Sequence, residues 1–320
     1  MLKEAAEFIR RHQEFVLIAH ISPDGDTLGS SLALSAAMKN AGKKAEIVCG
    51  DPVPDLYRFL PGASSVRKPS EVQPKDAVIT VDCATLSRAG DGQRLFDSAD
   101  ETLCIDHHRT NGGFADVNFV RRASSAGELI VKLLKELGYA MNREIGICLY
   151  TAISTDTGNF AYSGTTPDTF RTMAEILETG FDLPEVNRIL FRTVPLRKVR
   201  LTSLVLDRMQ LSRNNAVAVS YAELKDFAAC GAKAEDSDGI IDSMRDIDTV
   251  AAAAFLRECE DGTVRVSFRG KNKVDVSRIA SAFDGGGHRL AAGCTLNMTM
   301  SEAVRIMTEA LQNAYDGTES

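Results

Sequence analysis

Short apolar segments that each end in a histidine or an aspartate constrain the fold of this chain more than any other feature. Three segments share the pattern: residues 15–19 before His20, 77–81 before Asp82 and 102–105 before Asp106. Each is short and partly β-branched, which is typical of a buried strand in a parallel sheet. Open α/β sheets place their sites where the carboxyl ends of such strands meet. We therefore expect these polar side chains to converge at one edge of a sheet.

The length of the chain indicates more than one domain. Its 320 residues exceed the usual size of a single hydrophobic core. Residues 1–185 alternate strand-like and helical segments, with helices expected near residues 28–41 and 126–137. This alternation is typical of a parallel sheet covered by helices. We expect an α/β fold in which these residues form the larger domain.

The rest of the chain predicts a linker and a second domain. Residues 186–212 place apolar side chains at helical spacing around Pro195, which indicates a helical linker. Residues 213–320 contain strand-like runs, a glycine-rich segment and an amphipathic helix. The expected architecture is an N-terminal parallel-sheet domain flanked by helices, with a smaller C-terminal α+β domain across a cleft.

Charge and cysteine content restrict the partners and the compartment. A net charge of −7 argues against a surface that binds long duplex nucleic acid, because such surfaces are usually basic. The seven cysteines include no Cys-x-x-Cys pair, and their odd number favours reduced thiols. No segment resembles a signal peptide or a membrane span. We expect a cytoplasmic protein that binds neither long duplexes nor membranes.

Several aspartates admit both a structural and a metal-binding interpretation. Asp24 and Asp26 lie in a Pro-Asp-Gly-Asp turn just before a helical segment, where aspartate commonly forms the turn and caps the helix. His20 precedes Asp24 by four residues, however, and His and Asp together suit a divalent metal. Asp82 and Asp156 have similar alternatives, as a cap and as a turn residue. Taken one at a time, these carboxylates do not distinguish a structural role from metal binding.

The tripeptide Asp106-His107-His108 is harder to explain by structure alone. The chain has five histidines, and two adjacent imidazoles after a buried strand are unusual. Together with the carboxylates on other segments, they indicate the site of a two-metal hydrolase. The ligand set is rich in oxygen and lacks a thiolate, which favours a hard cation over zinc.

With these motifs the chain resembles the DHH phosphoesterase superfamily. The first four motifs occur in order as residues 19–26, Val81-Asp82, Asp106-His107-His108 and Thr155-Asp156-Thr157. The C-terminal part resembles the DHH-associated domain of the exonuclease branch. Its motifs are residues 274–277, 279–280 and 285–288, followed by Ala291-Ala292-Gly293. The resemblance therefore covers both expected domains.

The resemblance implies a ligand set for two metal ions. One ion would be held by His20, Asp24 and Asp82, and the other by Asp26, Asp82, His107 and Asp156, so that Asp82 bridges the pair. Asp106 would orient an imidazole, and His108 would face the substrate. Mn²⁺ is the metal favoured by the resemblance, with Mg²⁺, Co²⁺ or Fe²⁺ as alternatives.

The glycine-rich segment of the second domain has two interpretations. Gly286 and Gly287, before His288, could form a flexible turn, or their backbone N–H groups could approach a phosphate closely. The resemblance makes this segment, together with Arg269, a clamp for a terminal phosphate. Arg109, ranked above Arg88, is the further arginine expected to contact phosphate.

We expect phosphoester hydrolysis by a water activated between two metals. The size of the chain favours the nano-RNase branch, which degrades very short oligonucleotides to mononucleotides and converts pAp (adenosine 3′,5′-bisphosphate) to AMP and phosphate. A cyclic-dinucleotide or pApA phosphodiesterase is the alternative, and a single-strand exonuclease or a non-enzymatic nucleotide sensor has less support. The oligomeric state is not readable from the sequence, and a homodimer stays open.

Overall fold

The computed structural model describes residues 1–271 and 274–317 of the chain, which divides into two compact units. The first unit is Met1–Thr193 and the second is Val194–Ser320. The division falls inside the predicted linker. Of the two linker helices, α7 (Leu183–Phe191) packs on the core of the first unit, and α8 (Leu196–Asp207) packs on the core of the second.

The first unit contains a sheet of five parallel strands in the order β2-β1-β3-β4-β5. Its strands are β1 (Glu14–Ala19), β2 (Lys44–Val48), β3 (Ala77–Val81), β4 (Glu101–Asp106) and β5 (Val117–Val120). Every neighbouring pair is parallel. The predicted parallel sheet is confirmed, and three of its strands correspond to the apolar segments identified from the sequence.

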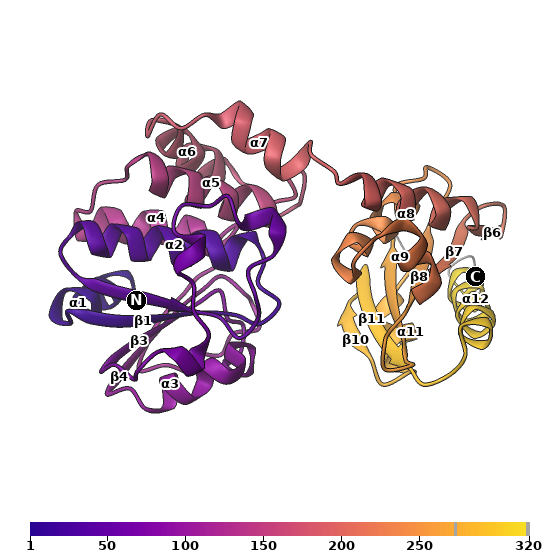
Figure 1. Ribbon diagram of the computed structural model, residues 1–320, viewed down its shortest axis with the longest axis horizontal. Helices are drawn as coiled ribbons and strands as arrows, with labels where there is room; N and C mark the ends of the chain where they lie inside the picture. Colours follow the sequence, from indigo (N-terminus) through magenta and orange to yellow (C-terminus); the bar gives the residue numbers. More distant parts are fainter. Residues whose placement is uncertain (272–273, 318–320) are drawn as a thin grey trace. The chain divides into compact units, whose positions relative to one another are not determined.

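Helices cover both faces of this sheet (Figure 1). The α-helices of the first unit besides α7 are α1 (Leu2–Arg11), α2 (Gly25–Asn40), α3 (Gln93–Asp97), α4 (Ala126–Leu137), α5 (Arg143–Asp156) and α6 (Pro167–Leu177). Its 3-10 helices are η1 (Asp55–Tyr57), η2 (Ala63–Ser65), η3 (Pro69–Glu71) and η4 (Leu86–Gly92). Alternation along β1 divides the core: Phe15 and Leu17 pack with α2 and α4, whereas Val16 and Ile18 pack with α3. Burial on both faces explains the continuous apolar character of these strands.

The second unit is built on a mixed sheet of six strands in the order β10-β11-β9-β8-β7-β6. These are β6 (Gln210–Ser212), β7 (Val217–Ala222), β8 (Ala252–Glu258), β9 (Val264–Gly270), β10 (Gly286–His288) and β11 (Ala291–Leu296). Only the β7–β8 pair is parallel among the described pairs. The predicted second α+β body is confirmed.

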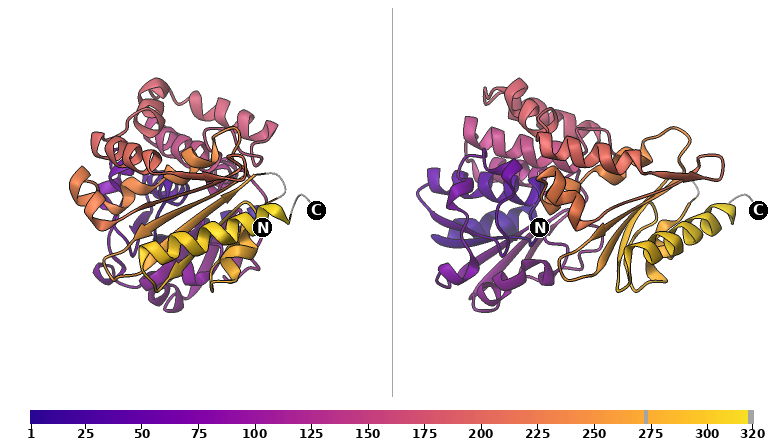
Figure 2. Two further views of the ribbon diagram at one scale, coloured as in Figure 1. Left: turned by 90° about the vertical axis from the view of Figure 1, so that its right-hand side faces the viewer. Right: turned by 45° about the vertical axis from the view of Figure 1, so that its right-hand side comes forward.

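Helices also lie on both faces of the second sheet. Figure 2 shows one of them, α12, as the yellow helix beside the strands. The helices that follow α8 are α9 (Leu224–Cys230), η5 (Ala234–Ser237), α10 (Ile240–Arg245), α11 (Val276–Ser281) and α12 (Met300–Asp316). Val217 and Val219 pack with α11 and α12, and Ala218 packs with α8, α9 and α10. Among the described residues, no helix combines the length and apolar character needed to cross a membrane.

Candidate metal centre

The carboxyl ends of three neighbouring strands deliver the first polar side chains of the site. His20 follows β1, Asp82 follows β3, and Asp106 is the last residue of β4. The strand register aligns the residues before them, Ala19 with Val81 and Val81 with Ile105. Asp82 has a φ of 60°, in the left-handed region that a non-glycine residue rarely adopts. The predicted convergence at one sheet edge is confirmed.

Two helices on the same face of the sheet bring the other carboxylates. Asp24 caps the N-terminus of α2, and Asp26 lies in its first turn, while Asp156 is the last residue of α5. Gly29 allows α2 and α5 to approach, because a Cβ atom there would lie 2.4 Å from the carbonyl oxygen of Cys148. Close packing of these two helices therefore places Asp26 and Asp156 at the same sheet edge.

His20 lies between two of the carboxylates. Its Nε2 is 3.6 Å from Oδ2 of Asp24 and 3.5 Å from Oδ2 of Asp82. Its Nδ1 is 2.8 Å from the carbonyl oxygen of Ile21, which accepts a hydrogen bond when that nitrogen carries the proton. Burial opposes protonation of His20, but the carboxylates of Asp24 and Asp82 outweigh it and raise its pKa to about 10. A metal ion held at Nε2 would therefore displace a proton.

His107 occupies the corresponding position among the other carboxylates. Its Nε2 lies 3.4 Å from Oδ1 of Asp82, 3.4 Å from Oδ2 of Asp156 and 3.7 Å from Oδ2 of Asp26. Asp26 is also held by the first turn of α4, whose backbone N–H groups at Ala126 and Gly127 donate to it at 2.6 and 3.0 Å. The positive end of a helix dipole thus faces this buried carboxylate.

Asp82 is shared by the two histidine groups, since its Oδ2 faces His20 and its Oδ1 faces His107. Among the described residues, this Oδ1 is buried and has no hydrogen-bond partner. An unpaired carboxylate oxygen is costly to bury, so it needs a cation or a proton. Two ligand atoms bound to one ion at about 2.1 Å lie roughly 3.0 to 3.5 Å from each other. The imidazole nitrogens and carboxylate oxygens of this cluster are separated by similar distances, 3.4 to 3.7 Å. The donor set therefore fits two metal ions with Asp82 between them.

His108 has a different environment from His107. Its Nδ1 donates a hydrogen bond of 2.7 Å to Oδ1 of Asp106, and its side chain is 41% exposed. The other oxygen of Asp106 accepts from Nδ2 of Asn111 at 2.7 Å. Asp106 thus holds the exposed imidazole of His108, while Nδ1 of His107 faces the carbonyl oxygen of Ala123 at 3.3 Å.

The charges of the cluster perturb one another strongly. Burial opposes protonation of His107, but Asp82 and the other nearby carboxylates outweigh it and raise its pKa to about 10. Burial and the charge of Asp82 raise the pKa of Asp26 well above its ordinary value. Burial, together with nearby carboxylates and against the attraction of His107, raises the pKa of Asp156 to about 6. A divalent cation bound among these groups would displace such protons.

The predicted phosphate contacts of the second unit lie on two strands of its sheet. Arg269, on β9, donates from Nε to Oδ1 of Asp242 at 3.0 Å. Gly286, Gly287 and His288 form β10, and all three are exposed. In the first unit, Arg109 is exposed directly after the Asp-His-His tripeptide.

Two contacts at the centre were not predicted. Nη2 of Arg88 lies 2.8 Å from Nδ1 of His20, although sequence reasoning ranked Arg88 below Arg109. Asn111 donates to Asp106 and also to the carbonyl oxygen of Cys83, so it links β4 to the segment after β3. Its position three residues after the tripeptide is the only signal in the sequence, and it gives no hint of these partners.

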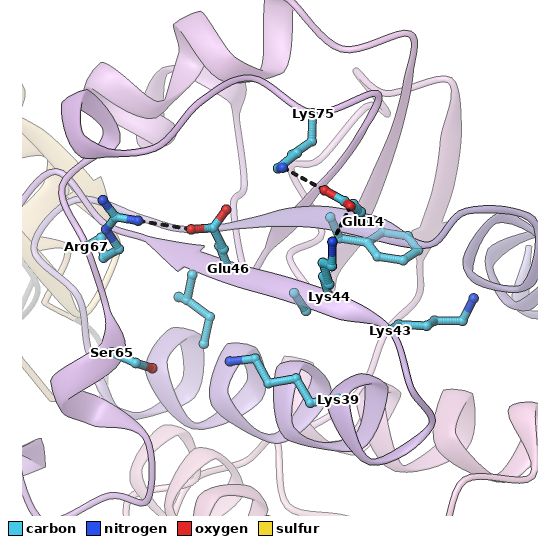
Figure 3. A pocket seen from close by; sticks show the side chains of 11 residues that line it. Glu14, Lys39, Lys43, Lys44, Glu46, Ser65, Arg67 and Lys75 are labelled. Carbon is cyan, nitrogen blue, oxygen red and sulfur yellow. Dashed lines mark hydrogen bonds and ion pairs between the residues drawn. The ribbon is translucent and has the colours of Figure 1, made fainter.

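A cavity of about 430 Å³ along the edge strand β2 is distinct from this centre (Figure 3). Three of its five basic residues form ion pairs, Lys44 and Lys75 with Glu14 and Arg67 with Glu46. None of the predicted metal ligands lines it. The metal cluster, rather than this cavity, is the candidate site.

Comparison with known proteins agrees with this geometry. Residues 14–153 match the N-terminal domain of the DHH family, and residues 214–315 match the DHHA1 domain. The chain is 36% identical to the bifunctional oligoribonuclease and PAP phosphatase NrnA of Thermus thermophilus over 97% of this chain and 93% of that protein. It is 30% identical to the Bacillus subtilis protein of the same name over 97% of each chain.

A solved structure shares the fold. The crystal structure of an exopolyphosphatase-related protein from Bacteroides fragilis superimposes with a TM-score of 0.92 at 26% identity, covering 100% of this chain and 97% of that one. The family models match the two units separately, and the NrnA relatives match nearly the whole chain. The chain belongs to the DHH family and carries a DHHA1 domain after the DHH domain.

Proposed function

We propose that this protein is a metal-dependent phosphoesterase that hydrolyses very short oligonucleotides to mononucleotides, pAp to AMP and phosphate, or both. The observation that carries the proposal is Asp82, whose two oxygens face the imidazoles of His20 and His107. The names of the full-length relatives supply the substrate class. The reaction adds one water across a P–O bond.

The metal ligands of the proposal are those expected from the sequence. His20, Asp24 and Asp82 would hold one ion, and Asp26, Asp82, His107 and Asp156 would hold the other. In support, His20, Asp24 and Asp82 form one group and Asp26, His107 and Asp156 form another, and Oδ1 of Asp82 lies 3.4 Å from Nε2 of His107. Bound there, two divalent ions supply an activated water and stabilise charge on the phosphoryl oxygens. Mn²⁺ is the ion we propose, since oxygen and imidazole donors suit it.

His108 is the proposed proton donor to the leaving oxygen. Its imidazole is the most exposed of the cluster's histidines, so it can face a substrate. The hydrogen bond to Asp106 raises the pKa of His108 above its ordinary value, which favours the protonated form. Asp106 fixes the ring and stabilises the imidazolium, and Asn111 holds Asp106 in place. A positioned acid of this kind contributes about 10²- to 10⁴-fold in rate.

The second unit is proposed to bind the end of the substrate. The exposed backbone N–H groups of Gly286 and Gly287 and the side chain of His288 suit a terminal phosphate. Arg269 suits bidentate phosphate recognition but is paired with Asp242, so a phosphate would share it with that carboxylate. Arg109 in the first unit is the further proposed contact.

A cytoplasmic location and a small phosphorylated substrate complete the proposal. Its competitor is a cyclic-dinucleotide or pApA phosphodiesterase, which would use the same metal centre with a different base pocket. The net charge of −7 supports a short substrate over a long duplex in both cases. A homodimer is a separate hypothesis, which light scattering coupled to gel filtration tests directly.

The decisive experiment compares specificity constants in Mn²⁺ for a 5′-phosphorylated diribonucleotide, pAp, cyclic di-AMP and pyrophosphate, with Asp82→Ala as the blank. The proposal predicts that the diribonucleotide or pAp gives the highest kcat/KM. Dominance of cyclic di-AMP would favour the competitor, and nucleotide binding without turnover would favour a sensor. His288→Ala should raise KM for the preferred substrate more than it lowers kcat.

A further inference from the structure

An exposed aromatic ring lies in the loop that follows Asp156, and packing alone does not account for it. We propose that Tyr162 is a stacking platform for a nucleobase of the substrate. The proposal rests on the function proposed above and deepens it, because it names how the site would recognise a nucleoside rather than a bare phosphate ester.

Both ends of the loop of residues 157–166 are fixed beside candidate metal ligands. The loop begins directly after Asp156. At its other end it enters α6, where Oγ1 of Thr169 donates to Glu128 in the first turn of α4 at 3.4 Å. The first backbone N–H groups of that same turn hold Asp26. The loop therefore runs from one candidate metal ligand to a helix that contacts the turn holding another.

The loop has a defined conformation rather than an open one. The buried hydroxyl of Thr157 donates to Ile153 at 2.6 Å and accepts from the backbone N–H of Phe160 at 3.1 Å. The N–H of Tyr162 donates to the carbonyl oxygen of Thr157 at 2.9 Å. Asn159 and Phe160 have φ values of 54° and 67°, which persist only where the surroundings impose them. The position of Tyr162 relative to Asp156 is thus fixed by hydrogen bonds.

The backbone at Gly158 packs against one face of the Tyr162 ring. A Cβ atom at this position would lie 2.4 Å from Cζ of Tyr162 and 2.6 Å from both Cε1 and Cε2. Because these three distances are nearly equal, the ring lies face-on against the glycine backbone. Gly158 also has a φ of 56°, which suits glycine on conformational grounds. The ring is therefore supported from beneath, two residues after Asp156.

Because one face of the Tyr162 ring rests on Gly158, the exposure of this residue falls on the opposite face and on the ring edge. Tyr162 is 57% exposed, although an aromatic ring of its size gains most from burial. A supported ring with one free face is the arrangement by which proteins stack unpaired bases, and such stacking tolerates any base. Phe160, which packs on the core, also contacts the exposed ring of Phe170 at 5.5 Å between centroids. The loop thus lies beside further aromatic surface.

A nucleobase is the occupant that the position favours. The neighbouring carboxylates of the metal centre would hold phosphate through bound cations, so the group that reaches the loop is the one attached to that phosphate. In an oligonucleotide this group is a nucleoside. The platform therefore recognises any nucleoside and does not select one base.

The test measures KM and kcat for 5′-phosphorylated diadenylate and for the same dinucleotide with abasic ribose in place of either base. We expect Tyr162→Ala to raise KM for diadenylate by roughly 5- to 100-fold with little change in kcat. Tyr162→Phe and Tyr162→Trp should retain the wild-type KM. At least one abasic substrate should give nearly the same KM with wild type and Tyr162→Ala.

Leu177→Ala is the matched control, since Leu177 is an exposed apolar residue at the far end of α6. It should leave both constants unchanged. An unchanged KM in Tyr162→Ala would overturn the platform. An equal rise in KM for diadenylate and for every abasic substrate would also overturn it, as would a fall in kcat alone, because these results indicate that Tyr162 only supports Asp156.

A binding measurement separates this proposal from the proposed function. Fluorescence of a 2-aminopurine dinucleotide reports stacking whether or not the enzyme turns it over. Quenching by wild type and Tyr162→Phe but not by Tyr162→Ala supports the platform even if the substrate is not hydrolysed, in which case only the proposed activity fails. Turnover with equal quenching by all three proteins keeps the activity and rejects the platform.

Discussion

The fully buried carboxylate of Asp106 accepts a 2.7 Å hydrogen bond from Nδ1 of His108, the exposed imidazole of the metal centre. Asp106→Asn replaces the carboxylate by an amide of equal size. The substitution removes the negative charge that stabilises the imidazolium of His108. We expect kcat to fall by about 10- to 100-fold, as for other outer-shell partners of site histidines, with little change in KM. Steady-state kinetics on pAp and on a diribonucleotide measures both constants.

Measuring the amount of bound metal distinguishes this loss of kcat from damage to the metal site. Asp106→Asn should retain two Mn²⁺ per chain by elemental analysis, because the proposed role of Asp106 is to hold His108 rather than a metal. Loss of metal together with kcat would contradict that role and make Asp106 a ligand.

Asp82→Ala should lower kcat/KM by at least about 10³-fold, because several kcal/mol of charge stabilisation depends on the metal pair. It should also abolish the rise in melting temperature that Mn²⁺ produces in the wild type. In the wild type that rise corresponds to about 4 kcal/mol at a metal concentration 1,000 times the Kd. Differential scanning calorimetry with and without Mn²⁺ measures it.

The metal-free proteins provide the check on folding. In the metal-free protein Asp82 repels Asp26, whose pKa it raises, but it attracts His20 and His107, whose pKa values it also raises. The melting temperature of metal-free Asp82→Ala relative to metal-free wild type therefore measures the balance of these contacts on folding, separately from the effect of metal. Asp97→Ala, an exposed aspartate at the end of α3, serves as the control and should keep both the activity and the response to Mn²⁺.

Gly29→Ala should destabilise the protein, although alanine favours helices by up to about 1 kcal/mol relative to glycine. The added Cβ would lie 2.4 Å from the carbonyl oxygen of Cys148 and 3.0 Å from the backbone nitrogen of Ala152. Such contacts with backbone atoms require α2 and α5 to move apart. We expect the free energy of unfolding to fall by about 1 to 3 kcal/mol, as measured by urea denaturation.

Activity should fall with stability in this variant, because α2 carries Asp26 and α5 carries Asp156. Gly164→Ala is the control: its Cβ would meet nothing within 4 Å, and its φ is not positive. If Gly29→Ala matched Gly164→Ala in stability and activity, close packing of the two helices would not be what positions the carboxylates.

The sequence was most informative where an apolar strand pattern is followed by a polar residue. The runs before His20, Asp82 and Asp106 predicted the parallel sheet and the edge at which the side chains meet, because buried parallel strands are apolar throughout. Asp24 illustrates two roles in one residue: its Oδ1 caps α2 by accepting from Thr27 at 3.1 Å, and its Oδ2 faces His20. The helix cap is therefore observed, and the metal-binding interpretation stays a prediction that this geometry permits.

Other features depend on tertiary contacts that no local pattern encodes. The tripeptide does not reveal which histidine contacts Asp106, because both imidazoles are within reach and the backbone turn decides. Asn111 reaches Asp106 only because the chain folds back after the tripeptide. The approach of α2 to α5 at Gly29 likewise depends on packing between distant segments.

Glu14 links stability to pH at the edge of the first sheet. Hydrogen bonds and charge from Lys44 and Lys75 lower the pKa of this carboxyl from 4.5 to about 2. A lowered pKa in the folded state means that the ionised form of Glu14 stabilises the fold. This stabilisation is complete above the unfolded pKa and decreases as pH falls from 4.5 toward 2.

Urea denaturation of wild type and Glu14→Gln should therefore show a difference in unfolding free energy that is constant between pH 5 and 7 and narrows below pH 4.5. The group is exposed, so 0.5 M NaCl should shrink the difference at every pH. A difference that grows on acidification would reverse the sign and rule out this ion pair as its source.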